Sequence, residues 1–354
     1  MKGPCLMSNI LLNKLSTELI YDTSCNQSET QKTFVTVCLS CYCCEKTIIQ
    51  ALESLLQQTY RDYEIIISDD CSTDCSVSVL LAFLKSYTGN IPIKLFKSIK
   101  NQGTLWNRFP CLYFGKGQLF VLADGDDYSF PDRLEKVVEC WNKLENKPSI
   151  IATNSIIVRN EIISNEISIP GSDKMFSPGD PVNTPFICYT AGFVLSRQFF
   201  DLFKENLPTT RIIADDSVLG RRAILANGMY FMSQPVFYYR YSPSSTSGSG
   251  CNGKNWILDR INRWDLLLSD IAYIRPDHTV PPGLKKRILH ERKKMEIDAK
   301  AIDCRLWIWW YYWLRMILLS PQESVAMLKK RIKLIVRGSV NAPWKRKKET
   351  GENL

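Results

Sequence analysis

Apolar residues follow two different periods along the first half of the chain. Short apolar runs rich in β-branched residues predict buried strands, and longer segments with apolar residues three or four positions apart predict helices. The strands are expected at 34–40, 63–68, 91–96 and 118–123, and the helices at 45–58 and 72–87. Strands that alternate with helices through short connections are typical of an α/β fold with an open, mostly parallel sheet.

The whole chain is expected to form three regions. Residues 1–31 are expected to be an N-terminal extension, and residues 32–245 to be the α/β domain. The later part of this domain predicts antiparallel strands at 149–169, a helix at 212–227 and a strand at 232–241. Residues 246–354 are expected to form a helical C-terminal region that ends in a basic tail.

Acidic residues directly follow two of the predicted strands. Asp69-Asp70 follows the strand at 63–68, and the segment Asp124–Asp127 follows the strand at 118–123. In open α/β sheets, ligands bind beyond the carboxyl ends of the strands. Carboxylates at such an edge suit Mg²⁺ or Mn²⁺ held between the protein and a diphosphate, and Gly125 allows a close approach of the backbone. A polar turn before the next helix is the simpler alternative for this segment.

Three segments of the chain together resemble a family 2 glycosyltransferase of the GT-A fold. The first includes VTVCLSCY, LLQQTY, YEIIISDDCSTD and VLADGDD at 34–133, the second is IIADDSVLGRRAILANG at 212–228, and the third is FYYRY at 237–241. The resemblance implies an open, mostly parallel sheet flanked by helices that binds a nucleotide sugar. It also implies transfer of the sugar to an acceptor hydroxyl, in the synthesis of a surface polysaccharide or glycolipid.

The resemblance further implies roles for individual residues. Asp216, with Asp215 as second choice, would be the general base that takes the proton from the acceptor hydroxyl, in a transfer that inverts the anomeric centre. Asp126, with Asp127 as second choice, would hold Mn²⁺ or Mg²⁺, which neutralises the departing diphosphate. The nucleotide sugar, expected to be UDP-linked, would be contacted by Ser40, Cys41, Tyr42, Asp69, Asp70, Asp124, Gly125 and Arg240.

Simpler interpretations of these residues remain open. Acidic residues at 215–216 would also stabilise the positive N-terminal end of a helix. The family's Pro-Thr-Tyr-Asn is replaced by Ser-Cys-Tyr-Cys at 40–43, and six cysteines at 38–75 allow a zinc or redox site, although their spacing matches no standard zinc pattern. Inert thiols are the default. The alternative function is a non-catalytic binding protein at the membrane surface that retains the fold.

Charge and aromatic residues are concentrated in the C-terminal region. Residues 284–354 carry a net charge of +11, whereas the first 283 residues carry −2. The aromatic segment at 306–319 predicts a helix in the membrane surface at 304–320, because Trp and Tyr favour the headgroup region and basic residues favour anionic lipids. Packing of this helix against protein is the alternative. The longest uncharged run there has nine residues, Leu306 to Leu314, too few to span a bilayer.

The composition narrows the expected partners and location. Only two histidines are present, both in the C-terminal region, so a Ser-His-Asp hydrolase or a His-rich zinc site is not expected. Thirteen cysteines without a convincing signal peptide favour free thiols and a cytoplasmic protein, peripheral at the inner face of the membrane. The expected partners are a glycan or lipid-linked acceptor and an anionic membrane surface, and no nucleic acid is expected.

Overall fold

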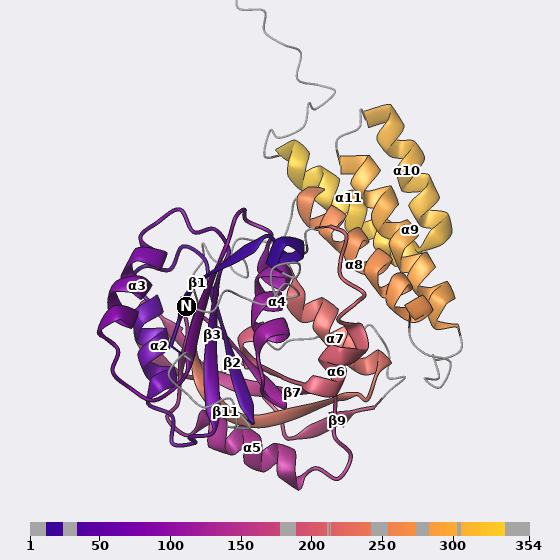
Figure 1. Ribbon diagram of the computed structural model, residues 1–354. Helices are drawn as coiled ribbons and strands as arrows, with labels where there is room; N and C mark the ends of the chain where they lie inside the picture. Colours follow the sequence, from indigo (N-terminus) through magenta and orange to yellow (C-terminus); the bar gives the residue numbers. More distant parts are fainter. Residues whose placement is uncertain are drawn as a thin grey trace, which may run out of the picture. The chain divides into compact units, whose positions relative to one another are not determined.

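The computed structural model describes residues 12–23, 34–177, 189–210, 212, 214–241, 254–273, 283–302 and 306–336 (Figure 1). The chain divides into two compact units. The first consists of Met1–Gly250 and Ser269–Pro281, and the second consists of Cys251–Leu268 and Pro282–Leu354. The predicted boundary after residue 245 lies close to the end of the first segment, but Ser269–Pro281 belongs to the first unit and not to the C-terminal region.

The first unit is built on one mixed sheet. The strand order is β1-β4-β3-β2-β5-β10-β7-β11-β6, with β8 beside β7 and β9 beside β11. Strands β2 to β5 are parallel to one another, and β1 and β10 join them antiparallel. The strands are β1 (Thr17–Asp22), β2 (Val35–Cys41), β3 (Tyr63–Asp69), β4 (Ile93–Ser98), β5 (Leu119–Asp124), β6 (Tyr128–Ser129), β7 (Ile150–Arg159), β8 (Ile162–Ile167), β9 (Lys174–Phe176), β10 (Phe193–Ser196) and β11 (Met229–Tyr241).

Helices cover both faces of this sheet (Figure 1). Side chains of α2, α3 and α5 pack with alternate residues of the central strands in one core, because successive strand residues point to opposite faces. On the other face, Cys111 of α4 donates to the Ile66 carbonyl, and Phe200 of α6 packs on Phe120. The helices are α2 (Ile48–Leu56), α3 (Ser76–Ser86), α4 (Thr104–Phe114), α5 (Arg133–Lys143), α6 (Arg197–Phe203) and α7 (Asp215–Leu225), with a 3₁₀ turn η2 (Thr190–Gly192) before β10.

Several parts of the first unit, among them β1, α4, β10 and α6, have no counterpart in the sequence prediction. Strand β1 lies within the predicted N-terminal extension and pairs with β4, so the expectation that residues 1–31 stand outside the fold is wrong for this segment. Helix α4 has no counterpart among the predicted elements. It contains Pro110, a residue that normally ends or kinks a helix, and this obscures its helical pattern.

The second unit is helical, as expected for the C-terminal region. It contains most of α8 (Lys254–Tyr273), together with α9 (Leu284–Ile302), α10 (Leu306–Leu319) and α11 (Pro321–Val336). A core of five buried residues joins α9, α10 and α11: Ile297, Ala301, Trp309, Met316 and Met327. Within the described residues, every helix is too short or too polar to cross a membrane. The basic tail beyond residue 336 lies outside the described residues.

Candidate active site

The two predicted acidic strand ends meet at one edge of the sheet. Strand β2 lies between β3 and β5, and its register places Cys41 opposite Asp69 and Ser40 opposite Asp124. Because all three strands are parallel, their carboxyl ends point the same way. The residues predicted to contact the nucleotide sugar and the metal ion therefore lie on either side of a single strand.

At the end of β3, both carboxylates are used to hold loops. Asp69 is fully buried and accepts hydrogen bonds from the amide and the hydroxyl of Ser72, the former at 3.0 Å. Asp70 is also buried, and its two oxygens accept from the amides of Gln102 and Gly103 at 2.7 and 2.8 Å. These contacts close the turns after β3 and before α4. A role of Asp69 and Asp70 in nucleotide binding stays a prediction.

At the end of β5, three carboxylates converge. One oxygen from each of Asp124, Asp126 and Asp127 lies within 4.8 Å of the others. Desolvation by the surrounding protein, together with the charge of Asp124, raises the pKa of the exposed Asp126 to about 6, and burial raises the pKa of Asp127 well above its usual range. Like charges held this closely are destabilising unless a cation or a proton compensates them. The cluster therefore has the composition of a site for a hard divalent cation.

Arg240 on β11 fixes the acidic loop from the opposite side. Its amide donates to an Asp127 oxygen at 2.8 Å, and its guanidinium donates to the Asp126 carbonyl at 2.7 Å. The guanidinium also contacts Gln50 and lies 4.8 Å from the centre of the Tyr128 ring. The predicted diphosphate contact thus lies beside the three carboxylates, where its charge partly offsets theirs.

Gly125 lies in close packing within the protein. A Cβ atom at this position would lie 2.7 Å from Cys44 Sγ and 2.8 Å from Ile48 Cδ1. The Gly125 amide donates to the Ser40 carbonyl, and its carbonyl accepts from the Thr47 hydroxyl, each at 2.8 Å. The glycine therefore lets the acidic loop pack directly on the connection between β2 and α2.

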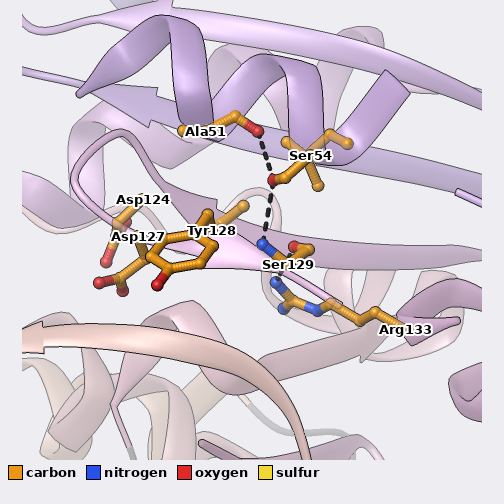
Figure 2. A pocket seen from close by; sticks show the side chains of 9 residues that line it. Ala51, Ser54, Asp124, Asp127, Tyr128, Ser129 and Arg133 are labelled. Carbon is orange, nitrogen blue, oxygen red and sulfur yellow. Dashed lines mark hydrogen bonds between the residues drawn. The ribbon is translucent and has the colours of Figure 1, made fainter. Parts of the chain in front are cut away.

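A recess beneath the acidic loop is occupied by supporting contacts (Figure 2). The Ser54 hydroxyl accepts from the Ser129 amide at 3.0 Å and donates to the Ala51 carbonyl at 2.7 Å. The buried Arg133 donates to the Ser129 hydroxyl and to the carbonyls of Leu122 and Ala191. The recess is too narrow to admit a water molecule, so it supports the loop and offers no room for a nucleotide.

Arg108 on α4 joins the acidic loop to helix α7, and sequence reasoning does not identify it. Its buried guanidinium donates to Asp124 at 2.6 Å, to Asp215 at 3.3 Å and to the Ala123 carbonyl at 3.0 Å. Burial lowers the pKa of Arg108, but the charges of Asp124 and Asp215 outweigh burial and raise the pKa above its usual value. One buried cation thus holds together two of the predicted acidic positions.

The two aspartates at the start of α7 have different surroundings. Asp215 is buried, pairs with Arg108 and accepts from the Thr190 hydroxyl at 2.7 Å. Burial raises its pKa, and Arg108 opposes this effect. Asp216 is half-buried, and one of its oxygens accepts from the Ser217 amide at 2.6 Å. This arrangement favours Asp216 over Asp215 as the group that can reach a substrate.

The residues at the carboxyl end of β2 and directly after it are divided between the interior and the surface. Cys41 is buried, and its Sγ lies 3.4 Å from Cys44 Sγ, a contact that, together with burial, raises the pKa of Cys41. Tyr42 is exposed, and the Ser40 hydroxyl is buried without a hydrogen-bond partner among the described residues. Within that same part of the chain, the three aspartates are the only group of three or more metal-ligating side chains, so the cysteines form no zinc site there.

The sheet, its two helical layers and its acidic carboxyl edge define an α/β protein of the GT-A type. The sequence model of glycosyl transferase family 2 matches residues 36–225, more than half of the chain. The chain belongs to this family, which confirms the predicted family, the fold class and the assignment to the glycosyltransferases.

Individual relatives match shorter stretches. EpsE of Bacillus subtilis (strain 168) is 36% identical over 109 residues, which cover 31% of this chain and 38% of EpsE. The UDP-Glc:alpha-D-GlcNAc-diphosphoundecaprenol beta-1,3-glucosyltransferase WfgD of Escherichia coli is 28% identical over 136 residues, which cover 38% of this chain and 51% of WfgD. The chain therefore spans about half the length of these relatives or less.

A solved structure extends the likeness to most of the fold. S. aureus TarS 1-349, crystallised in complex with UDP-GlcNAc, superimposes with a TM-score of 0.59 at 17% identity. The superposition covers 83% of this chain and 84% of TarS 1-349. At this identity the comparison supports the fold alone.

Proposed function

We propose that the protein transfers a sugar from a nucleotide-sugar donor to a hydroxyl of a glycan or lipid-linked acceptor. The donor that we expect first is UDP-linked. The observation that carries this proposal is the group of three carboxylates at the end of β5, tied through Arg108 to the start of α7 where Asp216 lies. The name of WfgD supports a UDP-linked donor and a lipid-linked acceptor.

The acidic cluster fits Mn²⁺ or Mg²⁺ as cofactor. All the atoms that the cluster offers to a cation are oxygens. One of them, Asp127 Oδ2, is buried without a hydrogen-bond partner among the described residues. Asp126, with Asp127 and Asp124, would hold the ion together with the donor diphosphate. When bound, the cation would neutralise the negative charge of the departing nucleotide diphosphate.

The chain's own residues supply the remaining steps. Asp216 would accept the proton of the acceptor hydroxyl as that oxygen attacks the anomeric carbon from the side opposite the diphosphate, which inverts the configuration. The N-terminus of α7 favours a negative charge at Asp216. Arg108 and Thr190 hold Asp215, the preceding residue, and so fix the first turn of the helix that presents the base.

Nucleotide release from a panel of UDP-, GDP- and dTDP-sugars, with and without Mn²⁺, tests this function without knowledge of the acceptor. We expect metal-dependent release from one donor, and its loss by about 100-fold or more in Asp126→Asn, because the exposed carboxylate holds the cation. The matched control is Asp201→Asn on α6, which removes a surface carboxylate outside the cluster and should keep full activity.

Two results would overturn the proposal. Equal release by wild type and Asp126→Asn would remove the acidic cluster from the reaction. Absence of both release and nucleotide binding across the panel, measured by calorimetry, would favour the non-catalytic binding protein.

A further inference from the structure

Among the described side chains of helix α10, those of one face pack within the helical unit. Trp309 and Met316 are buried against α9 and α11, and the Trp313 indole donates to the Ser324 carbonyl of α11 at 2.9 Å. Figure 1 shows α9, α10 and α11 side by side. Packing against protein, the alternative considered from the sequence, therefore accounts for this face of the aromatic segment.

The opposite face of α10 is apolar and exposed. Trp310, Tyr311, Leu314 and Leu318 have exposed fractions of 44%, 55%, 55% and 88%. At about 100° per residue, these positions fall within one arc of about 100°, on the side of the helix away from Trp309 and Met316. Arg315 borders this arc and lies 5.6 Å from the Tyr311 ring. A continuous apolar arc of this kind is more typical of an interaction surface than of a surface that stays exposed to water.

The same unit carries a large excess of positive charge. Its described residues contain 15 Lys and Arg against 6 Asp and Glu. Among the described residues, five of the acids pair with Arg263, Arg292 and Lys294. The remaining positive charge includes a set of exposed side chains: Lys285, Lys286, Arg287, Lys293, Lys300, Arg315 and Lys329.

We propose that the exposed face of α10 docks on an anionic lipid bilayer, with Trp310, Tyr311, Leu314 and Leu318 entering the headgroup region. Trp and Tyr suit this region because their rings are apolar and their N–H or O–H groups remain hydrated. The basic side chains of the unit supply the long-range attraction to a negative surface, and the apolar face supplies the contact once the protein arrives.

Docking of this kind would hold the enzyme at the surface where a lipid-linked acceptor is found. The inference extends the proposed function but does not depend on it, since binding to lipid needs neither donor nor acceptor. The predicted location at the inner face of the membrane stays a prediction.

Cosedimentation of the full chain with vesicles tests the docking surface. Vesicles of phosphatidylcholine alone are compared with vesicles containing about one-third phosphatidylglycerol, at about 0.1 M and about 0.5 M NaCl. We expect binding to the anionic vesicles that weakens at high salt. The double change Leu314→Ser and Leu318→Ser should lower the partition coefficient about tenfold or more, because two apolar side chains no longer enter the bilayer.

The control is Ile162→Ser on β8, which removes an apolar side chain that is 71% exposed in the first unit. It should bind vesicles as wild type does. The single change Leu318→Ser, at the most exposed position of the face, keeps the test valid if the double variant unfolds. Absence of wild-type binding, or equal binding by the α10 variants, would overturn the proposal. So would a wild-type dimer that dissociates in the α10 variants, because a second copy of the chain would then cover the face.

Discussion

The carboxyl ends of β3 and β5 both carry aspartates, on either side of β2, but these aspartates differ in burial and in their hydrogen-bond partners. At β3, Asp69 and Asp70 are buried and satisfied by amides and a hydroxyl of neighbouring loops. At β5, Asp126 is exposed and Asp127 has one buried oxygen without a partner among the described residues. The first pair stabilises the fold, whereas the second group has an electrostatic cost that a cation would remove.

The same contrast is found within one dipeptide of α7. Asp215 is buried and held by Arg108 and Thr190, and Asp216 is half-buried at the first turn. Acidic residues at this edge of the sheet therefore differ in how far the protein buries them. The residue type does not reveal this difference, which only the folded structure shows.

The largest effect is expected when Asp215 and Asp216 of α7 are replaced by asparagine one at a time. Asp216→Asn should lower kcat by about 10²–10⁴-fold, because the acceptor hydroxyl loses its base, with little change in nucleotide Kd or in the free energy of unfolding. Asp215→Asn should instead lower the free energy of unfolding by about 3 kcal/mol, because Arg108 loses a buried charge partner. Steady-state kinetics, calorimetry and urea unfolding measure these quantities. Full activity in Asp216→Asn beside a folded but inactive Asp215→Asn would move the base to Asp215.

Arg108 links Asp124 in the acidic loop to Asp215 at the start of α7. Arg108→Met should lower the free energy of unfolding by about 3–5 kcal/mol, because Asp124 and Asp215 lose their shared cation. Arg108→Lys keeps the charge but cannot reach three acceptors in a plane, so it should fold and still lose kcat with a smaller change in nucleotide Kd. The control is Arg197→Met, which removes an arginine bound to the Gly115 and Gly117 carbonyls. Wild-type kcat in Arg108→Lys would reduce Arg108 to a purely structural residue.

The sequence is enough to locate the acidic residues but not Arg108. Asp124–Asp127 and Asp215-Asp216 stand at the ends of regular elements, where an acidic residue contrasts with the apolar pattern. Arg108 lies in the middle of α4, which Pro110 disguises, and its carboxylate partners are 16 and 107 residues away. No local spacing rule connects positions so far apart in the chain.

Strand β1 escapes sequence prediction for a related reason. Its residues pair with β4, more than 70 positions later in the chain, and among the described strands β1 lies at the edge of the sheet. An edge strand of this kind tolerates polar residues, so its alternation is weak. The partners of Asp70 are also non-local, since Gln102 and Gly103 lie more than 30 residues away. The sequence therefore shows that Asp70 is acidic but not that it is already satisfied.

The smallest expected effect is on the free energy of unfolding, which substitutions at the ends of β3 and β5 should change in opposite directions. Asp70→Asn should lower the free energy of unfolding by about 1–3 kcal/mol, because an amide has only one acceptor oxygen for the two backbone amides. Asp127→Asn should leave the metal-free protein equally stable or more stable. Its oxygen can keep the bond from the Arg240 amide, and a buried carboxyl whose ionised form is disfavoured is replaced by a neutral group.

Urea unfolding in excess chelator measures both variants against wild type. An equal loss of stability in both would mean that Asp127, like Asp70, is satisfied by the protein alone. A loss confined to Asp70→Asn, together with loss of Mn²⁺ binding confined to Asp127→Asn, would separate a carboxylate that builds the fold from one that the fold holds ready for a cation.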